Sequence, residues 1–152
     1  MNTPSSSLRS FTLSPPDNYN PIGGGAGCIC VSRGEFLLLK RSDCGRFPGQ
    51  WCNPGGKSEP GETKERSVQR EVFEEIGLDL SQDQFEFLKT VYISYLQWDY
   101  AFHLFRVDFG SERPVITLNE EHSEYRWLSL AEVLNSCLMP GERECYQLIY
   151  TN

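Results

Sequence analysis

The chain has 152 residues and a formal net charge of −7, and 39% of its residues are hydrophobic. This length suits one domain that is large enough to bury a core. The negative charge argues against a protein that binds long nucleic acid through its phosphates. No apolar run approaches the length of a membrane-spanning helix, so we expect no membrane partner.

The spacing of the cysteines contains no Cys-x-x-Cys pair, and no His-x3–5-His pattern accompanies them. Both observations argue against a structural zinc site. The N-terminus also lacks the hydrophobic region of a secretory signal. We therefore expect free thiols and a reducing, cytoplasmic location. The six cysteines are Cys28, Cys30, Cys44, Cys52, Cys137 and Cys145.

Residues 1–20 are rich in Ser, Pro and Asn and show no periodicity. This composition predicts a flexible N-terminal extension ahead of a single domain over residues 21–152. Leu8, Phe11 and Leu13 alternate well enough to form a short edge strand, so an ordered segment within the extension stays open. The sequence leaves the oligomeric state undecided, and a homodimer is among the alternatives.

Residues 23–32 begin with a glycine run and continue into a β pattern. A phosphate-binding loop would follow a strand and end in Lys-Ser or Lys-Thr, and this run does neither. We interpret the glycines as positions of close backbone approach within a strand. Residues 32–35 then predict a hairpin turn, with residues 36–40 as the returning strand. A loop follows, and residues 51–53 form a short strand that leads into the turn Pro54-Gly55-Gly56.

Basic residues are concentrated in the segment around this loop. Residues 33–70 contain eight Lys or Arg and five Asp or Glu, a net charge of +3 that leaves −10 for the rest of the chain. This excess suits a small polyphosphate bound by local cations, although scattered surface charge would look similar. Arg41, Arg46 and Lys57 are the candidate substrate-binding cations.

Residues 64–76 carry the signals of a helix. Thr63 is a favourable N-cap that follows the Pro60-Gly61 turn, and Gly77 supplies the left-handed residue that ends a helix. One side of this helix is apolar, and we predict that it is buried. The predicted buried side carries Val68, Val72, Phe73 and Ile76.

Three acids of the same helix, Glu71, Glu74 and Glu75, share an arc of about 100°. They repel one another by about 0.2–0.5 kcal/mol per close pair. They also lie toward the helix C-terminus, where the dipole disfavours negative charge. A solvated acidic face is one interpretation of such a run. The alternative is a set of oxygen ligands for a hard divalent cation such as Mg²⁺ or Mn²⁺.

A longer pattern in residues 56–78 favours the second interpretation. It reads Gly-x5-Glu-x7-Arg-Glu-aliphatic-x-Glu-Glu-x-Gly-aliphatic, from Gly56 to Leu78. At every specified position it resembles the signature of the Nudix hydrolase family, and the odds of a chance match in one chain are on the order of 10⁻⁸. The resemblance implies metal-dependent hydrolysis of a pyrophosphate bond in a nucleoside diphosphate that is linked to another group.

The resemblance also implies a metal site on the helix. Glu71, Glu74 and Glu75 are implied as ligands of Mg²⁺ or Mn²⁺, and the carbonyl of Gly55 is implied as a further ligand. Family members differ in which carboxylate takes the proton from water. Glu71 is our choice for that role, and Glu74 is the second acid that we place in the catalytic machinery.

Further residues are implied to support this site. Glu62 and Arg70 pair and orient the helix carboxylates; for Arg70 the alternative is an exposed ion pair that contributes little. Residues 119–128 resemble the Glu-His…Trp stretch of nucleotide-hydrolysing members, in which the Glu before the His binds the metal. That residue is Glu121 here, with Glu120 as the alternative.

The rest of the chain alternates between strands and helices. Its β-rich runs cover residues 85–96, 100–107, 115–118 and 125–128. Ser129 opens a helix to about residue 137 through a capping box, and Pro140 lies in the first turn of a last helix that reaches about residue 150. This order predicts an α/β (α+β) fold with a mixed sheet between helices. The Nudix fold is of that kind, and the resemblance covers roughly residues 24–135.

The favoured activity is hydrolysis of a (deoxy)nucleoside triphosphate to the monophosphate and pyrophosphate, and the alternatives are dinucleoside polyphosphates, coenzyme A and nucleotide sugars. Tyr95 lies where the dinucleoside-polyphosphate hydrolases carry a tyrosine, and it is our candidate substrate contact. The proline typical of ADP-ribose hydrolases is absent. Residues 37–56 resemble the coenzyme A-cleaving subgroup only in part, since Asn53 replaces the usual Phe. Aromatic residues that could stack on a base, or pack in the core, are Trp51, Tyr92, Tyr95, Trp98 and Tyr100.

Two hypotheses come from other classes of protein. Isopentenyl-diphosphate isomerases share this fold, and Pro48-Gly49-x-Trp51-x-Asn53 is similar to that family. The isomerase needs a cysteine where this chain has Gly56, and Cys52 lies four residues away. The other hypothesis is a non-catalytic nucleotide sensor. Such proteins often lose carboxylates of the signature, which are all present here.

Overall fold

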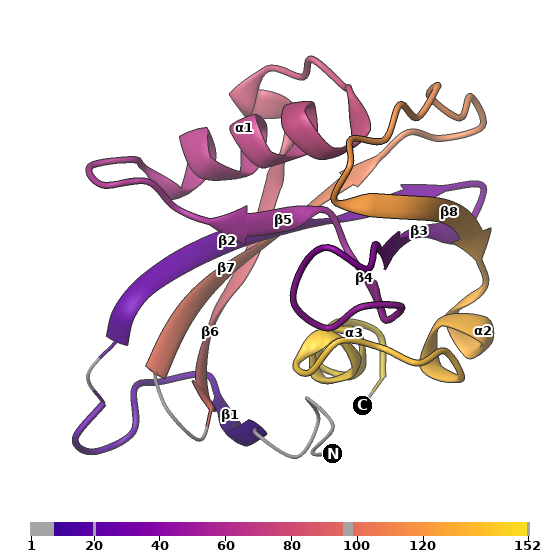
Figure 1. The fold of residues 1–152 in the computed structure, drawn as a ribbon. Helices are drawn as coiled ribbons and strands as arrows, with labels where there is room; N and C mark the ends of the chain where they lie inside the picture. Colours follow the sequence, from indigo (N-terminus) through magenta and orange to yellow (C-terminus); the bar gives the residue numbers. More distant parts are fainter. Residues whose placement is uncertain (1–7, 20, 96–98, 152) are drawn as a thin grey trace.

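The structure is a computed structural model that describes residues 8–19, 21–95 and 99–151. Its elements follow one another as strands, a helix, strands and two further helices (Figure 1). Their bounds are β1 Leu8–Thr12, β2 Pro21–Ser32, β3 Glu35–Arg41, β4 Trp51–Cys52, β5 Gly55–Lys57, α1 Lys64–Ile76, η2 Gln82–Gln84, β6 Glu86–Tyr95, β7 Asp99–Asp108, β8 His122–Leu128, α2 Leu130–Leu134 and α3 Glu142–Tyr150.

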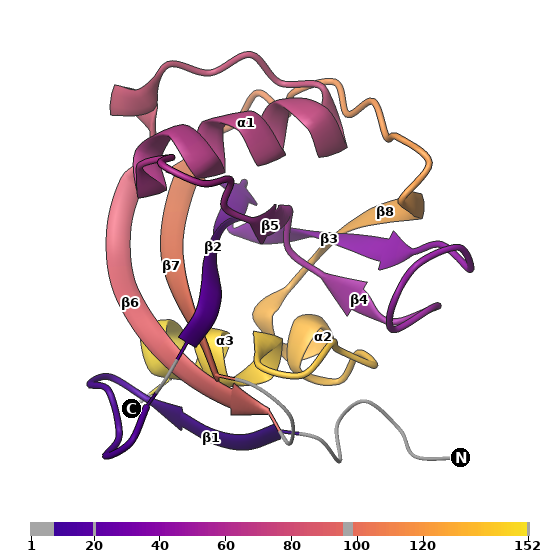
Figure 2. The ribbon, with the colours of Figure 1, turned by 60° about the vertical axis from the view of Figure 1, so that its left-hand side comes forward.

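The strands form one mixed sheet with the order β1-β6-β7-β2-β3-β4. Strand β2 pairs parallel with β7, from Gly24 opposite Ala101 to Val31 opposite Asp108, and antiparallel with β3. The short β5 pairs with β2, and β8 pairs with β3. Helix α1 lies on one face of the sheet, whereas α2 and α3 lie on the other (Figure 1, Figure 2). The predicted sandwich of a mixed sheet between helices is confirmed.

Each face of the sheet has its own apolar core. Under α1, Val68, Val72 and Ile76 are fully buried against the sheet. On the opposite face, Leu104 of the sheet and Tyr146 of α3 belong to a second buried cluster. The central strands contribute to both cores because successive side chains of a strand point to opposite faces.

Helix α1 begins and ends where its local signals predict. The Thr63 hydroxyl caps it by accepting a backbone N–H of the first turn at 3.1 Å. Gly77 ends it with a φ of 74° and donates its N–H to the Phe73 carbonyl at 3.1 Å. The prediction for the Phe73 side chain is wrong, because it is 56% exposed. Glu71 and Glu75, which are buried, lie on the side that faces the sheet instead.

The predicted boundaries differ most in the C-terminal part. Residues 115–118 form no strand, because the Thr117 N–H bonds the carbonyl of Ile76 at the end of α1 instead of a neighbouring strand. Strand β8 begins three residues earlier than predicted, and α2 ends at Leu134, short of residue 137. Pro140 precedes the last helix, since Gly141, with a φ of 96°, is the N-cap residue of α3.

The N-terminal edge strand is present. Strand β1 pairs antiparallel with β6, with Phe11 opposite Ile93. Residues 1–7 of the predicted flexible extension lie outside the described residues. The glycines that follow lie where backbones approach closely: a Cβ on Gly24 would lie only 2.9 Å from the carbonyl oxygen of Ala101.

All six cysteines are free thiols, and Cys44 and Cys137 are the exposed ones. Burial raises the pKa of the Cys28, Cys52 and Cys145 thiols well above the usual value, so these three are inert packing groups. Within the described part of the chain, no helix has the length and apolar composition that crossing a membrane requires.

Candidate active site

Arg70 is the centre of an ion-pair network on α1. Its guanidinium donates to both carboxylate oxygens of Glu62, from Nε at 2.7 Å and from Nη2 at 3.0 Å. Its Nη1 group donates to Glu71 at 3.0 Å and to Glu74 at 3.2 Å. Hydrogen bonds from Arg70 lower the pKa of Glu62 to about 2. The structure thus brings together Glu62, Arg70, Glu71 and Glu74, the residues proposed as catalytic from the sequence.

Two of the acids are buried under the turn that precedes the helix. Glu71 is 8% exposed and Glu75 is 2% exposed. Oε1 of Glu75 accepts the N–H of Gly55 at 2.9 Å, and Gly56 lies directly against the carboxyl group of Glu71. Burial raises the pKa of both carboxyl groups, and the charge of Glu71 adds to the effect on Glu75. Buried acids this close to one another need a cation or a proton to offset their repulsion.

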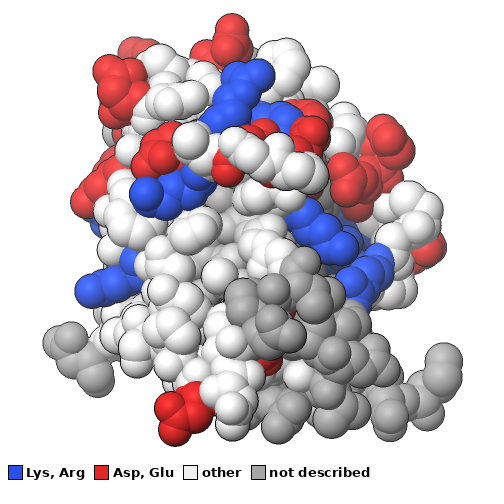
Figure 3. Space-filling view, turned by 90° about the vertical axis from the view of Figure 1, so that its left-hand side faces the viewer, with Lys and Arg blue, Asp and Glu red and all other residues white. Residues whose placement is uncertain are grey.

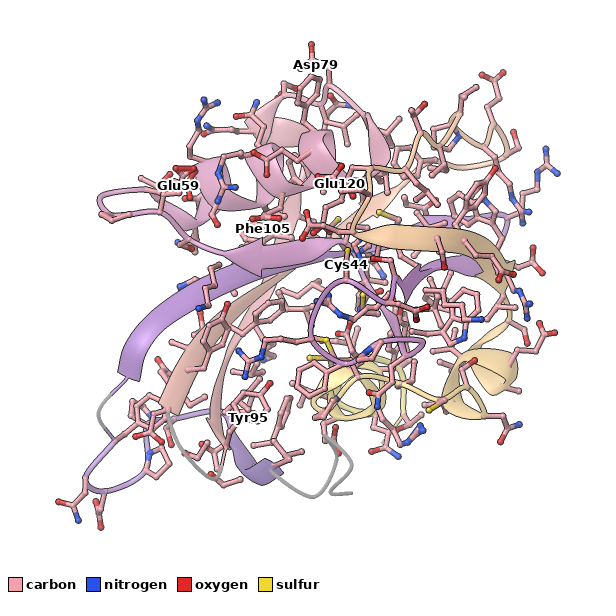
Figure 4. All side chains as sticks on the ribbon, in the orientation of Figure 1. Cys44, Glu59, Asp79, Tyr95, Phe105 and Glu120 are labelled. Atoms are coloured by element: carbon pink, nitrogen blue, oxygen red, sulfur yellow. The ribbon has the colours of Figure 1, made fainter. Side chains whose placement is uncertain are left out.

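The loop before β8 adds a further carboxylate to this region. The negative charge of Glu121 contributes to the raised pKa of both Glu71 and Glu75. The Glu121 side chain accepts a 3.1 Å hydrogen bond from the amide of Asn119. Glu120 lies between α1 and the start of β8 (Figure 4), and its backbone carbonyl accepts the Ser42 hydroxyl at 2.8 Å. The electrostatic coupling favours Glu121 as the loop carboxylate that faces the helix acids.

The donor atoms of this region match a hard divalent cation in type, since carboxylate and carbonyl oxygens are the ligands that Mg²⁺ takes. Among the described residues, no three acidic, His or Cys side chains already converge at metal-binding spacing. Arg70 and the N–H of Gly55 bond the helix carboxylates instead. The residues that could hold the cation are Gly55, Glu71, Glu74, Glu75 and Glu121.

A cavity of about 420 Å³ adjoins the acidic region. Gly55 and Gly56 line it, so its wall includes the backbone that contacts Glu75 and Glu71. Every substrate-binding residue proposed from the sequence lies in the same wall. These residues are Arg41, Arg46, Lys57 and Tyr95.

Two residues of α3, Glu142 and Cys145, also line the cavity. Figure 4 shows Tyr95 on the side of the sheet that carries α3, whereas Glu59 and Glu120 lie on the α1 side. Tyr100 and Phe102 also line the cavity. The wall of the cavity therefore combines cationic side chains, the backbone of the Gly55-Gly56 turn and aromatic side chains.

The other aromatic candidates contact the protein instead. The ring of Tyr92 packs edge-on against Tyr19, with a centroid separation of 5.6 Å. The ring of Trp51 lies 5.0 Å from the guanidinium of Arg126. Trp98 lies outside the described residues. Of the five aromatic candidates, the described structure thus places Tyr95 and Tyr100 at the cavity.

A buried hydrogen-bonded chain at this cavity was not predicted from the sequence. It consists of Asn53, Glu142 and Tyr146. The Asn53 N–H donates to Oε2 of Glu142 at 2.5 Å, and Nδ2 of Asn53 donates to Oε1 at 3.3 Å. The Tyr146 hydroxyl donates to Oδ1 of Asn53 at 2.5 Å. Burial raises the pKa of Glu142 to about 7. The sequence contains a sign of this buried acid. Glu142 lies on the same helix face as Cys145 and Tyr146, so it is an acid within an apolar stripe.

Charged side chains are concentrated around α1. Figure 3 shows Lys and Arg side chains next to Asp and Glu side chains over the end of the molecule that carries this helix, and few charges on the described surface below it. Neighbouring charges of opposite sign distinguish this region from a uniformly acidic solvated face.

The fold, the carboxylate helix and the adjoining cavity define the class of protein. The NUDIX domain family matches residues 22–149, and the chain therefore belongs to the Nudix hydrolase family. It is an enzyme of the Nudix pyrophosphohydrolase class.

Individual relatives lie within the same family. The chain is 36% identical over 118 residues to the nucleoside triphosphatase NudI of Enterobacter sp. (strain 638), a match that covers 71% of this chain and 82% of that protein. It is 33% identical over 125 residues to NudI of Klebsiella pneumoniae, covering 76% and 87%. The crystal structure of a MutT protein from Methanosarcina mazei Go1 superposes with a TM-score of 0.71 at 30% identity, covering 85% of this chain and 93% of that one.

Proposed function

We propose that the protein hydrolyses nucleoside triphosphates to the nucleoside monophosphate and pyrophosphate in a reaction that depends on Mg²⁺ or Mn²⁺. One observation carries the proposal: Gly55 both lines the cavity and donates its N–H to Glu75. A substrate in the cavity is thereby placed next to the carboxylates. The NudI relatives are nucleoside triphosphatases, which supports the same class of substrate.

Each group has a role in this reaction. Glu71, Glu74, Glu75 and Glu121, with the Gly55 carbonyl, would hold the cation, which when bound neutralises phosphate oxygens and lowers the pKa of water. Glu71 is our assignment for the proton acceptor, because its carboxyl group is closest to the Gly56 wall of the cavity. Arg70 and Glu62 position the carboxylates.

The cavity cations bind the phosphates. Arg41, at the end of β3, and Arg46, in the loop that follows, line the cavity, and Lys57 follows the Gly55-Gly56 turn. A guanidinium binds phosphate oxygens through a fork of two N–H groups, whereas an ammonium acts as a point charge. Tyr95 and Tyr100 offer ring surface to the nucleoside.

The packing at Gly56 argues against the isomerase hypothesis. That reaction needs a cysteine at position 56, and a side chain there would collide with the Glu71 carboxylate. Cys52, the nearby alternative, is 3% exposed and lies 3.6 Å from Nε2 of His122. Burial lowers the pKa of His122 to about 4, so the ring is neutral near pH 7 and does not activate the thiol as a cation.

The test is product analysis of a substrate panel with and without Mg²⁺: the standard (d)NTPs, Ap4A, ADP-ribose, coenzyme A and a nucleotide sugar. Release of monophosphate and pyrophosphate from a triphosphate, in Mg²⁺ only, is the expected result. Turnover of Ap4A or coenzyme A alone would change the substrate class. No metal-dependent turnover of any compound would contradict the proposal.

A variant pair ties turnover to the helix. Glu74→Gln removes a ligand and also relieves repulsion among the acids, so we expect loss of metal-dependent turnover with little loss of stability. Glu65→Gln is the matched control on the same helix, where Glu65 pairs with Lys64 at 3.3 Å. Wild-type activity in the Glu74 variant would refute the site assignment.

A further inference from the structure

The α3 end of the cavity carries a polar group that neither the phosphates nor the metal-binding acids explain. Glu142 lines the cavity from the first turn of α3, and Asn53, which bonds it twice, lines it from the residue after β4. Apolar and aromatic side chains line the same cavity. They are Ile93, Tyr95, Tyr100, Phe102, Met139 and Cys145.

Tyr146 determines which way the Asn53 amide points. Because the Tyr146 hydroxyl donates to Oδ1 of Asn53, the Nδ2 group faces Glu142, where it bonds Oε1 at 3.3 Å. An amide nitrogen carries two N–H groups, and one is used in this contact. Within the described residues, Glu142 is the only hydrogen-bond partner of this nitrogen, so its second N–H group is available to a ligand.

Glu142 also has unused hydrogen-bonding capacity. Each of its carboxylate oxygens accepts one bond from Asn53 and carries a second lone pair. Together, the two residues present two acceptors next to a donor. A buried carboxylate with spare acceptor capacity at a cavity wall is costly unless a ligand supplies donors to it.

The five common nucleobases differ in how they match this pattern. The Watson–Crick edge of guanine presents two adjacent donors, N1–H and the exocyclic amino group, beside the O6 acceptor. Adenine and cytosine place a ring-nitrogen acceptor beside their amino group, and that acceptor would face a carboxylate oxygen. Uracil and thymine place carbonyl oxygens on both sides of a single N–H. Only the guanine edge complements two acceptors and a donor.

We propose that Glu142 and Asn53 recognise the nucleobase and select guanine nucleotides. The inference deepens the proposed function and rests on it in one respect, namely that the cavity binds a nucleotide. Glu142 and Asn53 line the same cavity as Arg41 and as Gly55, whose N–H bonds the metal-binding acid Glu75. A nucleotide whose base contacts Glu142 therefore shares the cavity with a phosphate-binding cation and with the turn next to the acids.

Equilibrium binding of nucleoside monophosphates tests the proposal without turnover or metal. GMP, AMP, CMP and UMP are titrated in EDTA at about pH 8.5, where the carboxylate of Glu142 is ionised. We expect the wild type to bind GMP about tenfold more tightly than the other three. Glu142→Gln should lose that preference by about tenfold, because its amide N–H groups face the guanine donors.

A matched control is available on the same helix. Glu144→Gln makes the same change of charge two residues away, and Glu144 does not line this cavity. We expect Glu144→Gln to bind GMP as the wild type does. Equal affinity of the wild type for all four monophosphates, or a GMP preference that survives in folded Glu142→Gln, would overturn the proposal.

A second variant tests the proposal if Glu142→Gln does not fold. Tyr146→Phe removes the hydrogen bond that orients the Asn53 amide, so it should weaken the preference for GMP. An unchanged preference in Tyr146→Phe would then refute the proposal. Triphosphate hydrolysis without guanine selection would retain the proposed function and reject the base-recognition site. Guanine selection without hydrolysis of any triphosphate would retain the base-recognition site and reject the proposed function.

Discussion

The carboxyl group of Glu71 lies directly against the α carbon of Gly56. A Cβ added to Gly56 would lie 2.7 Å from both carboxylate oxygens and from the carboxyl carbon between them. Atoms cannot approach that closely without displacement, and Glu71 has little room to move because it is 8% exposed and bonded to Arg70. The glycine of the signature is therefore required by the position of one carboxylate.

Gly56→Ala should consequently displace the Glu71 carboxylate. We expect kcat for a nucleoside triphosphate to fall by about tenfold or more, since a shift of about 1 Å in a catalytic group can cost that much. The measurement is steady-state kinetics, with the unfolding temperature recorded in parallel. Gly45→Ala is the control, because its Cβ would be in ordinary contact, 3.5 Å from Arg41. Full activity in Gly56→Ala would show that Glu71 can move without loss.

Arg70→Lys tests the ion-pair network without changing its charge. A lysine ammonium cannot reproduce the two bonds to Glu62 while also bonding Glu71 and Glu74. We expect about tenfold lower kcat and a loss of about 1–3 kcal/mol in unfolding free energy, measured by urea denaturation. Arg66→Lys, on the exposed side of α1, should match the wild type in both measurements. A difference confined to stability would make Arg70 a purely structural residue.

Local signals predicted α1 well because its boundaries depend on local chemistry. The cap at Thr63 and the left-handed Gly77 act on the backbone next to them, so the sequence contains the whole cause. The buried side of the helix was less predictable. Phe73 is exposed while Glu71 and Glu75 are buried, because the turn at residues 55–56 provides a polar surface for the two acids.

Tertiary contacts explain the remaining differences. Residues 115–118 have a β-rich composition, but the Thr117 N–H bonds the end of α1, a partner that no sequence pattern identifies. The role of Glu142 at the cavity was not predicted for a similar reason. Its partner Asn53 lies 89 positions away in the chain, so the sequence shows an acid in an apolar stripe without showing what satisfies it.

The ion pair of Glu62 with Arg70 should make stability depend on acid pH. Hydrogen bonds from Arg70 lower the pKa of Glu62 from 4.5 to about 2 in the folded state. The stabilisation is therefore complete above the unfolded pKa of 4.5 and is lost as the pH falls toward 2. Urea unfolding from about pH 6 to about pH 3 should show a shallower decline for Glu62→Gln than for the wild type. Glu112→Gln, at an exposed position, should decline like the wild type.

The loop carboxylate can be identified by a pair of neighbouring substitutions. The charge of Glu121 acts on Glu71 and Glu75, so Glu121→Gln removes a group that faces the helix acids. We expect it to lower Mg²⁺-dependent kcat by about tenfold or more, and Glu120→Gln to have a much smaller effect. Titration of Mg²⁺ in the kinetic assay should show a raised requirement in the Glu121 variant. The opposite order would assign the metal-binding role to Glu120.

Glu142 should impose the opposite dependence of stability on pH. Burial is the largest cause that raises its pKa from 4.5 to about 7; Glu144 raises it further, while the bonds from Asn53 and the charge of Arg41 lower it. The folded state therefore retains a proton that the unfolded chain releases, and stability declines as the pH rises from 4.5 toward 7.

The size of this effect follows from the difference in pKa. At about 1.4 kcal/mol per pKa unit, the rise from 4.5 to about 7 corresponds to a decline of about 3–4 kcal/mol in unfolding free energy. Glu142→Gln has no titrating group at this position, so its stability should be flatter between about pH 5 and about pH 8 in urea denaturation. Glu144→Gln should retain most of the wild-type decline. Parallel curves for the wild type and Glu142→Gln would mean that the carboxyl group of Glu142 stays ionised throughout this range.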